Sequence, residues 1–306
     1  MSELQATLLV ALSAAGWGTW TLFTRGLGLA PIWMSVMILL VIAVTSLPLA
    51  LRRSLARPRE LAAPRAAWRT LPSLVALLGL FDAGNYYFFF SAIERGPVGV
   101  AVLAHYLAPV LVAVLAPLLL AEPLGARTPA ALAASLAGLS LLLFGAGGIH
   151  GDALPAALLG GASALFYGGN TLVSKRLLRE LGPAELLSYH CFISAALLAL
   201  VAPALAGPAP SLALFAGRPL AGALLLGVAC GAGFYLGLAR IPAQRAAVLT
   251  YFEPLVAALV GVLVWHERLG AIGAVGAALI VAGGIAVATS RNGKDARAAA
   301  PLAAGR

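Results

Sequence analysis

Ionisable side chains stand inside several long apolar runs of this 306-residue chain. Asp82, His105 and Glu253 each lie in a run long enough to cross a lipid bilayer, which takes about 20 residues. Because an ionisable group at membrane depth costs about 2.5–3.5 kcal/mol, such groups usually bind ligands, exchange protons or pair with another helix. Asp82 and Glu253 are therefore candidates for proton coupling. For Asp82, His105 and Glu253, a structural role as a hydrogen-bonded helix partner remains an alternative.

Polar and aromatic side chains gather on single faces of several predicted helices. Helical spacing places Asp82, Asn85 and Tyr86 on one face. Faces of the same kind occur on the first and sixth apolar runs, at corresponding positions of an internal repeat. We expect these faces to line one central cavity. The candidate substrate-binding residues are Trp17, Trp20, Asn85, Tyr86, His105, Tyr106, Tyr167, Asn170 and Tyr251.

One segment of the chain occurs twice. Residues 102–125 superpose on residues 247–270 after a shift of 145 positions. The matched pairs are Tyr106 and Tyr251, Pro109 and Pro254, and Glu122 and Glu267. A proline inside a helix removes one backbone donor and frees a carbonyl, which in lipid needs a partner in the protein or in a wet cavity. We expect the carbonyls of His105 and Thr250 to be open to a bound molecule.

The composition indicates an all-α integral membrane protein. The chain is 61% hydrophobic and 10% charged, whereas soluble domains carry about 25% charged residues. Apolar runs of spanning length predict ten transmembrane helices. These runs are residues 5–24, 31–50, 71–92, 98–120, 128–147, 153–174, 184–205, 219–239, 246–265 and 270–289.

The repeat extends over two halves of five helices each. Residues 17–25 align with residues 167–175 at a shift of 150 positions, and a cation, Arg25 or Lys175, closes each copy. Because five is an odd number, the second half enters the membrane upside down relative to the first, as in many secondary transporters. The predicted domains are residues 1–149, residues 150–290 and a disordered cytoplasmic tail, 291–306.

The net charge of +9 reflects membrane topology and does not indicate a nucleic-acid partner. With the N-terminus in the cytoplasm, 16 of the 20 lysines and arginines fall on the cytoplasmic side. This is a strong positive-inside bias, and it predicts that both termini are cytoplasmic.

The sequence contains no pattern typical of an enzyme, a cofactor site or a metal centre. We find no metal-ligand spacing, phosphate-binding loop or nucleophile elbow. We therefore expect no catalytic residues and no cofactor. An ion gradient, with protons as the first candidate, or the substrate gradient itself would then supply the energy.

The paired motifs resemble those of the drug/metabolite transporter superfamily. An aromatic-Gly segment ends in Arg25 or Lys175, and a Tyr-x-x-Pro segment leads to a helix-ending glutamate, as in carriers with two EamA domains and ten helices. The resemblance extends over residues 5–290 and implies a bacterial inner-membrane protein, often an exporter of amino acids and related metabolites. Glu253 precedes the proline of the second copy, whereas Ala108 precedes that of the first, so an acidic role is not duplicated.

The resulting hypothesis is a secondary transporter that exports small metabolites, in the first place amino acids, by alternating access. Its expected partners are a small-molecule substrate, membrane lipid and protons, and the chain would act as a monomer or a homodimer. Two alternatives stay open. One is an efflux carrier for cationic drugs, and the other is a membrane scaffold or receptor that transports nothing.

Overall fold

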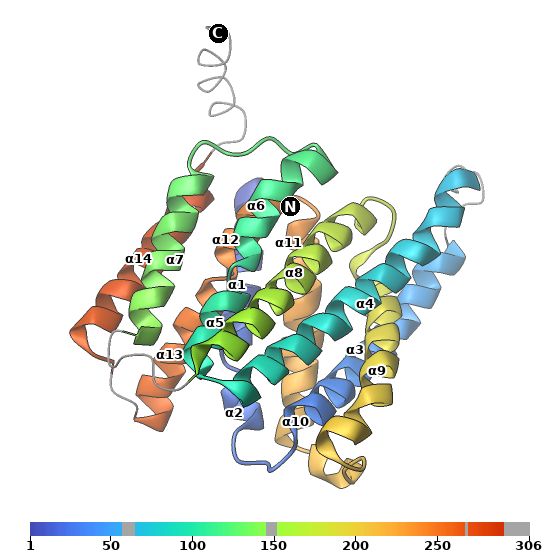
Figure 1. The fold of residues 1–306 in the computed structure, drawn as a ribbon. Coiled ribbons are helices and arrows are strands. Elements are labelled where there is room, and N and C mark those ends of the chain that lie inside the picture. Colours follow the sequence, from blue (N-terminus) through green and yellow to red (C-terminus); the bar gives the residue numbers. More distant parts are fainter. Residues whose placement is uncertain (57–64, 145–151, 267–268, 291–306) are drawn as a thin grey trace, which may run out of the picture.

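The computed structural model describes residues 1–56, 65–144, 152–266 and 269–290, and these residues are nearly all helical (Figure 1). The predicted tail, 291–306, and Glu267 lie outside the described residues.

The helices follow one another in two series that correspond to the two predicted halves. The first comprises α1 (Glu3–Trp17), α2 (Thr21–Thr24), α3 (Pro31–Ala56), α4 (Arg65–Arg95), α5 (Val98–His105), α6 (Ala108–Leu120) and α7 (Thr128–Phe144). The second comprises α8 (Ala153–Leu177), α9 (Pro183–Ala206), the 3₁₀ turn η2 (Leu212–Phe215), α10 (Arg218–Gly222), the π-helical segment η3 (Ala223–Cys230), α11 (Gly231–Leu238), α12 (Ala243–Leu249), α13 (Phe252–Trp265) and α14 (Ala271–Ala288).

Eight helical runs in the described part of the chain are long and apolar enough to cross a membrane. Several of them combine consecutive elements, such as α5 with α6 and α12 with α13. The apolar helix α7 has only 17 residues, and α8 is not among the eight. The all-helical membrane fold is therefore confirmed, while the exact count of ten crossings stays a prediction.

Both helices that contain the repeated proline are broken in two. Pro109 is the second residue of α6, a position where its missing N–H costs no helical hydrogen bond. The N–H of Val110 donates to the carbonyl of Leu107 at 3.0 Å, which closes a tight turn between α5 and α6. At the second break, the Glu253 N–H donates to the Thr250 carbonyl at 3.0 Å. The turn thus supplies one partner to the Thr250 carbonyl, whose second lone pair can still accept, and its role toward a bound molecule stays a prediction.

The two broken helices run in opposite directions. The Glu122 carboxylate, just after α6, accepts the N–H of Ala243, the first residue of α12, at 2.6 Å. Beside it, the Gln244 side chain donates to the Pro123 carbonyl at 2.6 Å and accepts the Gly125 N–H at 3.1 Å. Because the end of α6 meets the start of α12, equivalent helices of the two halves are antiparallel, as an inverted repeat requires (Figure 1).

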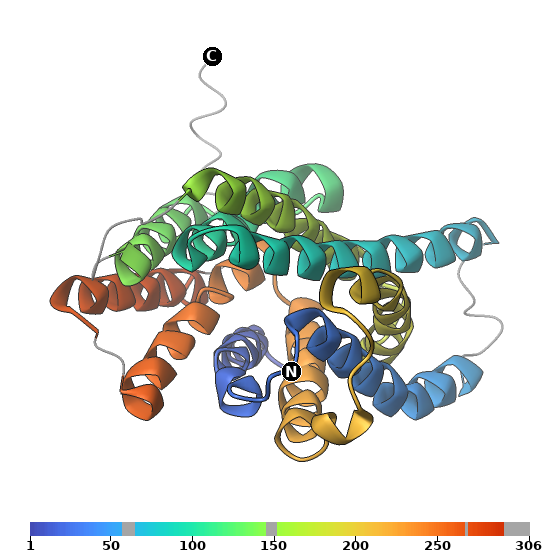
Figure 2. The same ribbon diagram turned by 60° about the horizontal axis from the view of Figure 1, so that its bottom comes forward.

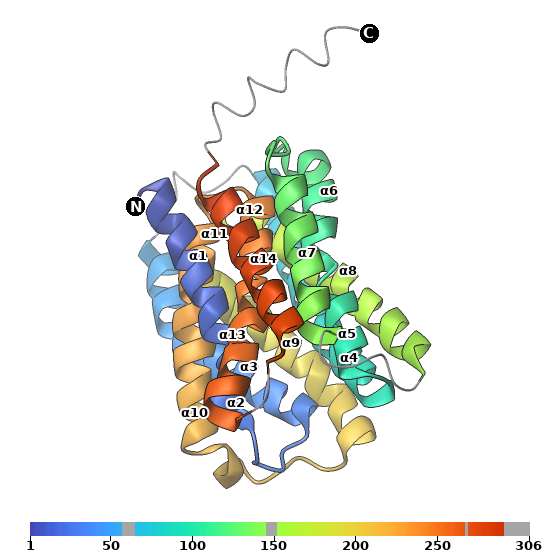
Figure 3. The same cartoon turned by 90° about the vertical axis from the view of Figure 1, so that its left-hand side faces the viewer.

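The main packing pairs join one half to the other. In Figure 2, α4 runs beside α8 on one side of the molecule, and α1 lies beside α11 on the opposite side. These two contacts are equivalent under the repeat. The second helices α3 and α9 pack on each other, and so do the fifth helices α7 and α14 (Figure 3). Gly138 and Gly276 allow the last contact, since a Cβ on either would meet the other's carbonyl at 2.6 or 2.4 Å.

A set of buried polar groups joins the halves at the end of the molecule where α6 ends. The Lys175 ammonium donates to the carbonyls of Leu238 at 2.6 Å and Ile241 at 2.8 Å, in the turn between α11 and α12. It also pairs with the Glu122 carboxylate at 3.6 Å. The last carbonyls of a helix have no partner within it, so Lys175 satisfies groups that lipid cannot. We call Glu122, Lys175 and the Leu238–Ile241 turn the polar latch.

Lys175→Met is expected to destabilise the folded protein. Removal of one partner from a buried, hydrogen-bonded ion pair costs about 3–5 kcal/mol, because the remaining charge and carbonyls stay buried. The melting temperature of the purified protein in detergent should fall by several degrees. Arg176→Met is the matched control, because Arg176 follows on the same helix but is exposed. Equal melting temperatures for the two variants would contradict the role of the latch.

Candidate substrate site

The two helix breaks meet through a tyrosine from one half and a backbone carbonyl from the other. The Tyr251 hydroxyl donates to the Tyr106 carbonyl at 2.8 Å, and the two rings lie 5.6 Å apart. In a continuous helix the Val110 N–H would donate to this carbonyl, but here that N–H bonds Leu107. Both tyrosines are buried, with exposed fractions of 4% and 0%. The break therefore leaves the Tyr106 carbonyl without a helical donor, and Tyr251 of the opposite half supplies one.

The carboxyl of Glu253 lies at the same junction. The Tyr106 side chain is within hydrogen-bond reach of it. The equivalent position in the first half is Ala108, so Tyr251 has no matching acid and bonds the Tyr106 carbonyl instead. Both halves thus contribute a helix break to the junction, but only the second half contributes an ionisable carboxyl group.

His105 belongs to a hydrogen-bonded chain between α4 and α8. Its Nδ1 lies 2.8 Å from the Ser163 hydroxyl, which donates to the Asn85 Oδ1 at 2.8 Å. Because the single hydroxyl proton of Ser163 goes to Asn85, we assign the His105 proton to Nδ1. The ring stacks on Tyr167 at 4.9 Å and contacts Phe89 at 4.6 Å. The arrangement holds the imidazole by one nitrogen and leaves Nε2 as an acceptor.

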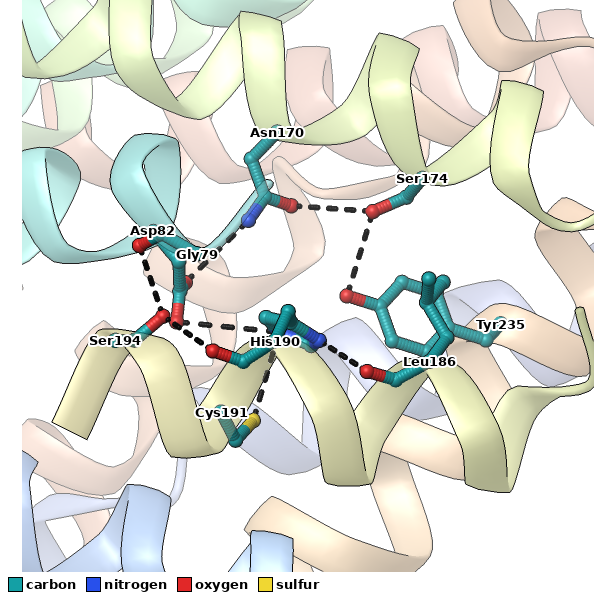
Figure 4. Close-up of polar contacts among 9 residues, drawn as sticks. All are labelled: Gly79, Asp82, Asn170, Ser174, Leu186, His190, Cys191, Ser194 and Tyr235. Atoms are coloured by element: carbon teal, nitrogen blue, oxygen red, sulfur yellow. Dashed lines mark hydrogen bonds and ion pairs between the residues drawn. The ribbon is translucent and has the colours of Figure 1, made fainter. Parts of the chain in front are cut away.

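Asp82 stands between three helices, in a second polar group (Figure 4). The Asn170 amide on α8 donates to its Oδ1 at 3.4 Å. His190 on α9 places Nε2 3.9 Å from Oδ2. His190 was not among the predicted site residues, because no spacing within one helix relates a residue of α4 to a residue of α9.

Tyr86 interacts electrostatically with Asp82, Tyr167 and Glu253. Together with Asn85 it extends the face of α4 that the helical spacing predicted. Asp82, Tyr86, Tyr167 and Glu253 are only half-buried, unlike Tyr106 and Tyr251.

The two tryptophans lie elsewhere. The indole N–H of Trp17 donates to the Leu226 carbonyl at 2.9 Å, and its ring lies 5.1 Å from Phe234. Leu226 belongs to η3, a π-helical segment, and π-helical turns often occur at functional sites. Trp20 lies near α10, where a Cβ on Gly222 would stand 3.2 Å from its ring. The structure thus brings together the predicted residues of α4, α5, α8 and the two breaks, and a substrate-binding role for any of them stays a prediction.

Comparison with known proteins identifies the family. The model of the EamA-like transporter family matches residues 4–144 and again residues 154–289. The chain belongs to this family. The family model matches the chain twice, in agreement with the two-repeat architecture. Membership of this family identifies the protein as a multi-pass membrane transporter.

Two relatives extend over nearly the whole EamA chain. It is 30% identical over 300 residues to the aromatic amino acid exporter YddG of Ancylobacter novellus, a match that covers 94% of this chain and 98% of that one. A solved structure described only as a crystal structure of a protein superposes with a TM-score of 0.76 at 26% identity. That match covers 94% of this chain and 99% of the other.

A glycine brings each half's first helix against the other half's break. A Cβ on Gly18, directly after α1, would meet the Glu253 carbonyl at 2.4 Å. Its repeat partner Gly168 on α8 faces the Ala108 carbonyl, and a Cβ there would stand 3.5 Å from that oxygen. Ala108 and Glu253 are themselves repeat partners, so corresponding residues meet in both halves, but only at Gly18 is the approach too close for a Cβ.

Gly18→Ala should disturb the second break. The added methyl group would overlap backbone atoms of α13, which cannot rotate away, and overpacking of this kind costs about 1–3 kcal/mol. We expect a lower melting temperature in detergent and reduced transport. Gly161→Ala is the control, because a Cβ there meets nothing within 4 Å, and a helical Gly→Ala change is neutral or favourable by up to about 1 kcal/mol. Wild-type behaviour of both variants would contradict the close approach.

Proposed function

We propose that this transporter exports amino acids, with a preference for aromatic ones, across the bacterial inner membrane by alternating access. The observation that carries the proposal is the junction of the two breaks, where the Tyr251 hydroxyl bonds the Tyr106 carbonyl beside Glu253. The name of the Ancylobacter relative supports the choice of cargo.

The junction offers both signs of charge that an amino acid requires. The carbonyl ends of α5 and α12 carry partial negative charge, and the amide ends of α6 and α13 carry partial positive charge. Broken helices use these ends to bind substrate groups near the membrane midplane in other transporters. A zwitterion can set its ammonium against Glu253 and the carbonyl ends, and its carboxylate against the amide ends.

The surroundings of the junction suit an aromatic side chain. Tyr86, Tyr106 and Tyr167 contribute rings from three different elements, and Phe89 contacts His105 between them. Aromatic pairs in offset or edge-to-face arrangements gain about 0.5–1.5 kcal/mol beyond area burial. These rings can also hold a cationic ammonium, which is why cationic drugs are the competing cargo.

The orientation follows from the positive-inside bias. We place both termini, and with them the polar latch, at the cytoplasmic face. At this face Arg245 also pairs with Glu3 at 2.6 Å and donates to the Ser290 carbonyl at 2.6 Å.

Flux through proteoliposomes tests the cargo and the junction together. Purified protein should accelerate uptake of radiolabelled phenylalanine or tryptophan, and Glu253→Gln should lower this flux at least about tenfold, since loss of one charge-assisted contact is worth about 1.5–3 kcal/mol. Glu94→Gln is the control, because Glu94 is an exposed acid at the end of α4. Protection against quaternary ammonium compounds that requires Glu253, without amino-acid flux, would establish drug efflux instead. No flux of either kind would favour the scaffold or receptor.

Proton coupling is assigned to Glu253, which lies at the junction that must rearrange. Transport should depend on an imposed pH gradient in the wild type, and Glu253→Gln should remove that dependence. The measurement is substrate flux with and without the gradient, at fixed internal pH. Full pH dependence in both Glu253→Gln and Asp82→Asn would contradict coupling at either carboxylate.

A further inference from the structure

We propose that Asp82, His190 and Cys191 bind one divalent transition-metal ion of the zinc type between α4 and α9. The three side chains offer an oxygen, a nitrogen and a sulfur atom that all lie within 4.8 Å of one another (Figure 4). The site lies apart from the Tyr106–Tyr251 junction, and the proposal does not rest on amino-acid export. The sequence carried no metal-ligand spacing, because the donors come from two helices far apart in the chain.

The imidazole of His190 is oriented as in a metal ligand. Its Nδ1 faces the carbonyl of Leu186, one turn earlier on α9, so Nδ1 carries the proton. A metal-binding histidine usually donates its second ring N–H to such a carbonyl, which fixes the tautomer and the ring plane. The lone pair of Nε2 is thereby directed toward Cys191 and Asp82.

The distances are compatible with one shared ion. Nε2 lies 3.5 Å from the Cys191 sulfur, a length that fits a thiol hydrogen bond and also two ligands of one metal ion. Tetrahedral bonds of about 2.0 Å to nitrogen and about 2.3 Å to sulfur place those two atoms about 3.5 Å apart. Nε2 lies 3.9 Å from the Asp82 Oδ2, which is longer than any hydrogen bond. A metal ion with bonds of about 2 Å bridges that gap after a small movement of the carboxylate.

One carboxylate oxygen lacks a partner among the described residues. Asp82 Oδ2 is buried without a hydrogen bond, whereas Oδ1 accepts from Asn170. An unsatisfied buried acceptor costs about 1–3 kcal/mol, and more when it is charged. A cation placed between Oδ2, Nε2 and the sulfur satisfies this oxygen and replaces the hydrogen bond between the other two atoms.

The charges of the proposed complex cancel. Binding deprotonates the Cys191 thiol, whose proton leaves to solvent, and the thiolate and the Asp82 carboxylate then balance the two positive charges of the ion. His190 binds as the neutral imidazole. A formally neutral site avoids the cost of a net charge at membrane depth. Nitrogen, sulfur and oxygen donors together suit Zn²⁺ and Co²⁺.

Cobalt titration tests the site without any transport assay. Tag-free full-length protein in detergent, titrated with Co²⁺, should develop a thiolate-to-cobalt absorption band that saturates at one ion per chain and is bleached by Zn²⁺. Cys191→Ser should abolish the band. Cys230→Ser should keep it, and it is a complete control because the chain has two cysteines. Asp82→Asn and His190→Gln should each weaken Co²⁺ binding at least about tenfold, since loss of even an outer-shell partner costs about 10–100-fold.

The proposal is overturned if the wild-type protein gives no saturable band, whatever the variants do. It is also overturned if the band survives in Cys191→Ser or disappears in Cys230→Ser. A Zn²⁺-dependent rise in melting temperature for the wild type and Cys230→Ser, absent in Asp82→Asn, is the second expected result, because an ion that binds only the folded state stabilises it. An equal rise in Asp82→Asn would count against the site.

Discussion

A backbone carbonyl inside a bilayer must find a partner, and this requirement governs the centre of the molecule. Lipid offers no donor, so every carbonyl that a helix break frees has to be satisfied by protein or by a wet site. At the first break, the Tyr106 carbonyl receives the hydroxyl of Tyr251 from the other half. At the second, the turn satisfies Thr250 itself. The carbonyl left open at the first break thus links the two halves.

The same dependence of one half on the other appears in the packing. The contacts of α4 with α8 and of α1 with α11 are repeat equivalents, and both cross between halves. α3 packs on α9 and α7 packs on α14, and in each pair the two helices hold the same position in their repeats. The hydrophobic core is therefore formed by both halves together.

Much of this architecture could be predicted from the chain, because it is encoded along single helices. Apolar length, the repeated Tyr-x-x-Pro and the shared face of Asp82, Asn85 and Tyr86 depend only on helical spacing and composition. Contacts between helices were not predictable in this way. His190 beside Asp82, the Trp17 bond to the Leu226 carbonyl and the carbonyl partners of Lys175 depend on which helices pack together and at what depth. A single sequence contains no period that links them.

The polar latch has a consequence for the energy needed to separate the helices that it joins. An apolar closure would expose hydrocarbon to water on opening, at about 25 cal/mol for each Å². The latch instead joins an ammonium, a carboxylate and two carbonyls, all of which water solvates well. Exchange of such bonds for bonds to water has a small net free energy. These contacts therefore hold the helices together firmly while lipid surrounds them. Water that reaches the groups can replace the contacts at a small net free energy, so hydration favours separation of the helices at this end of the protein.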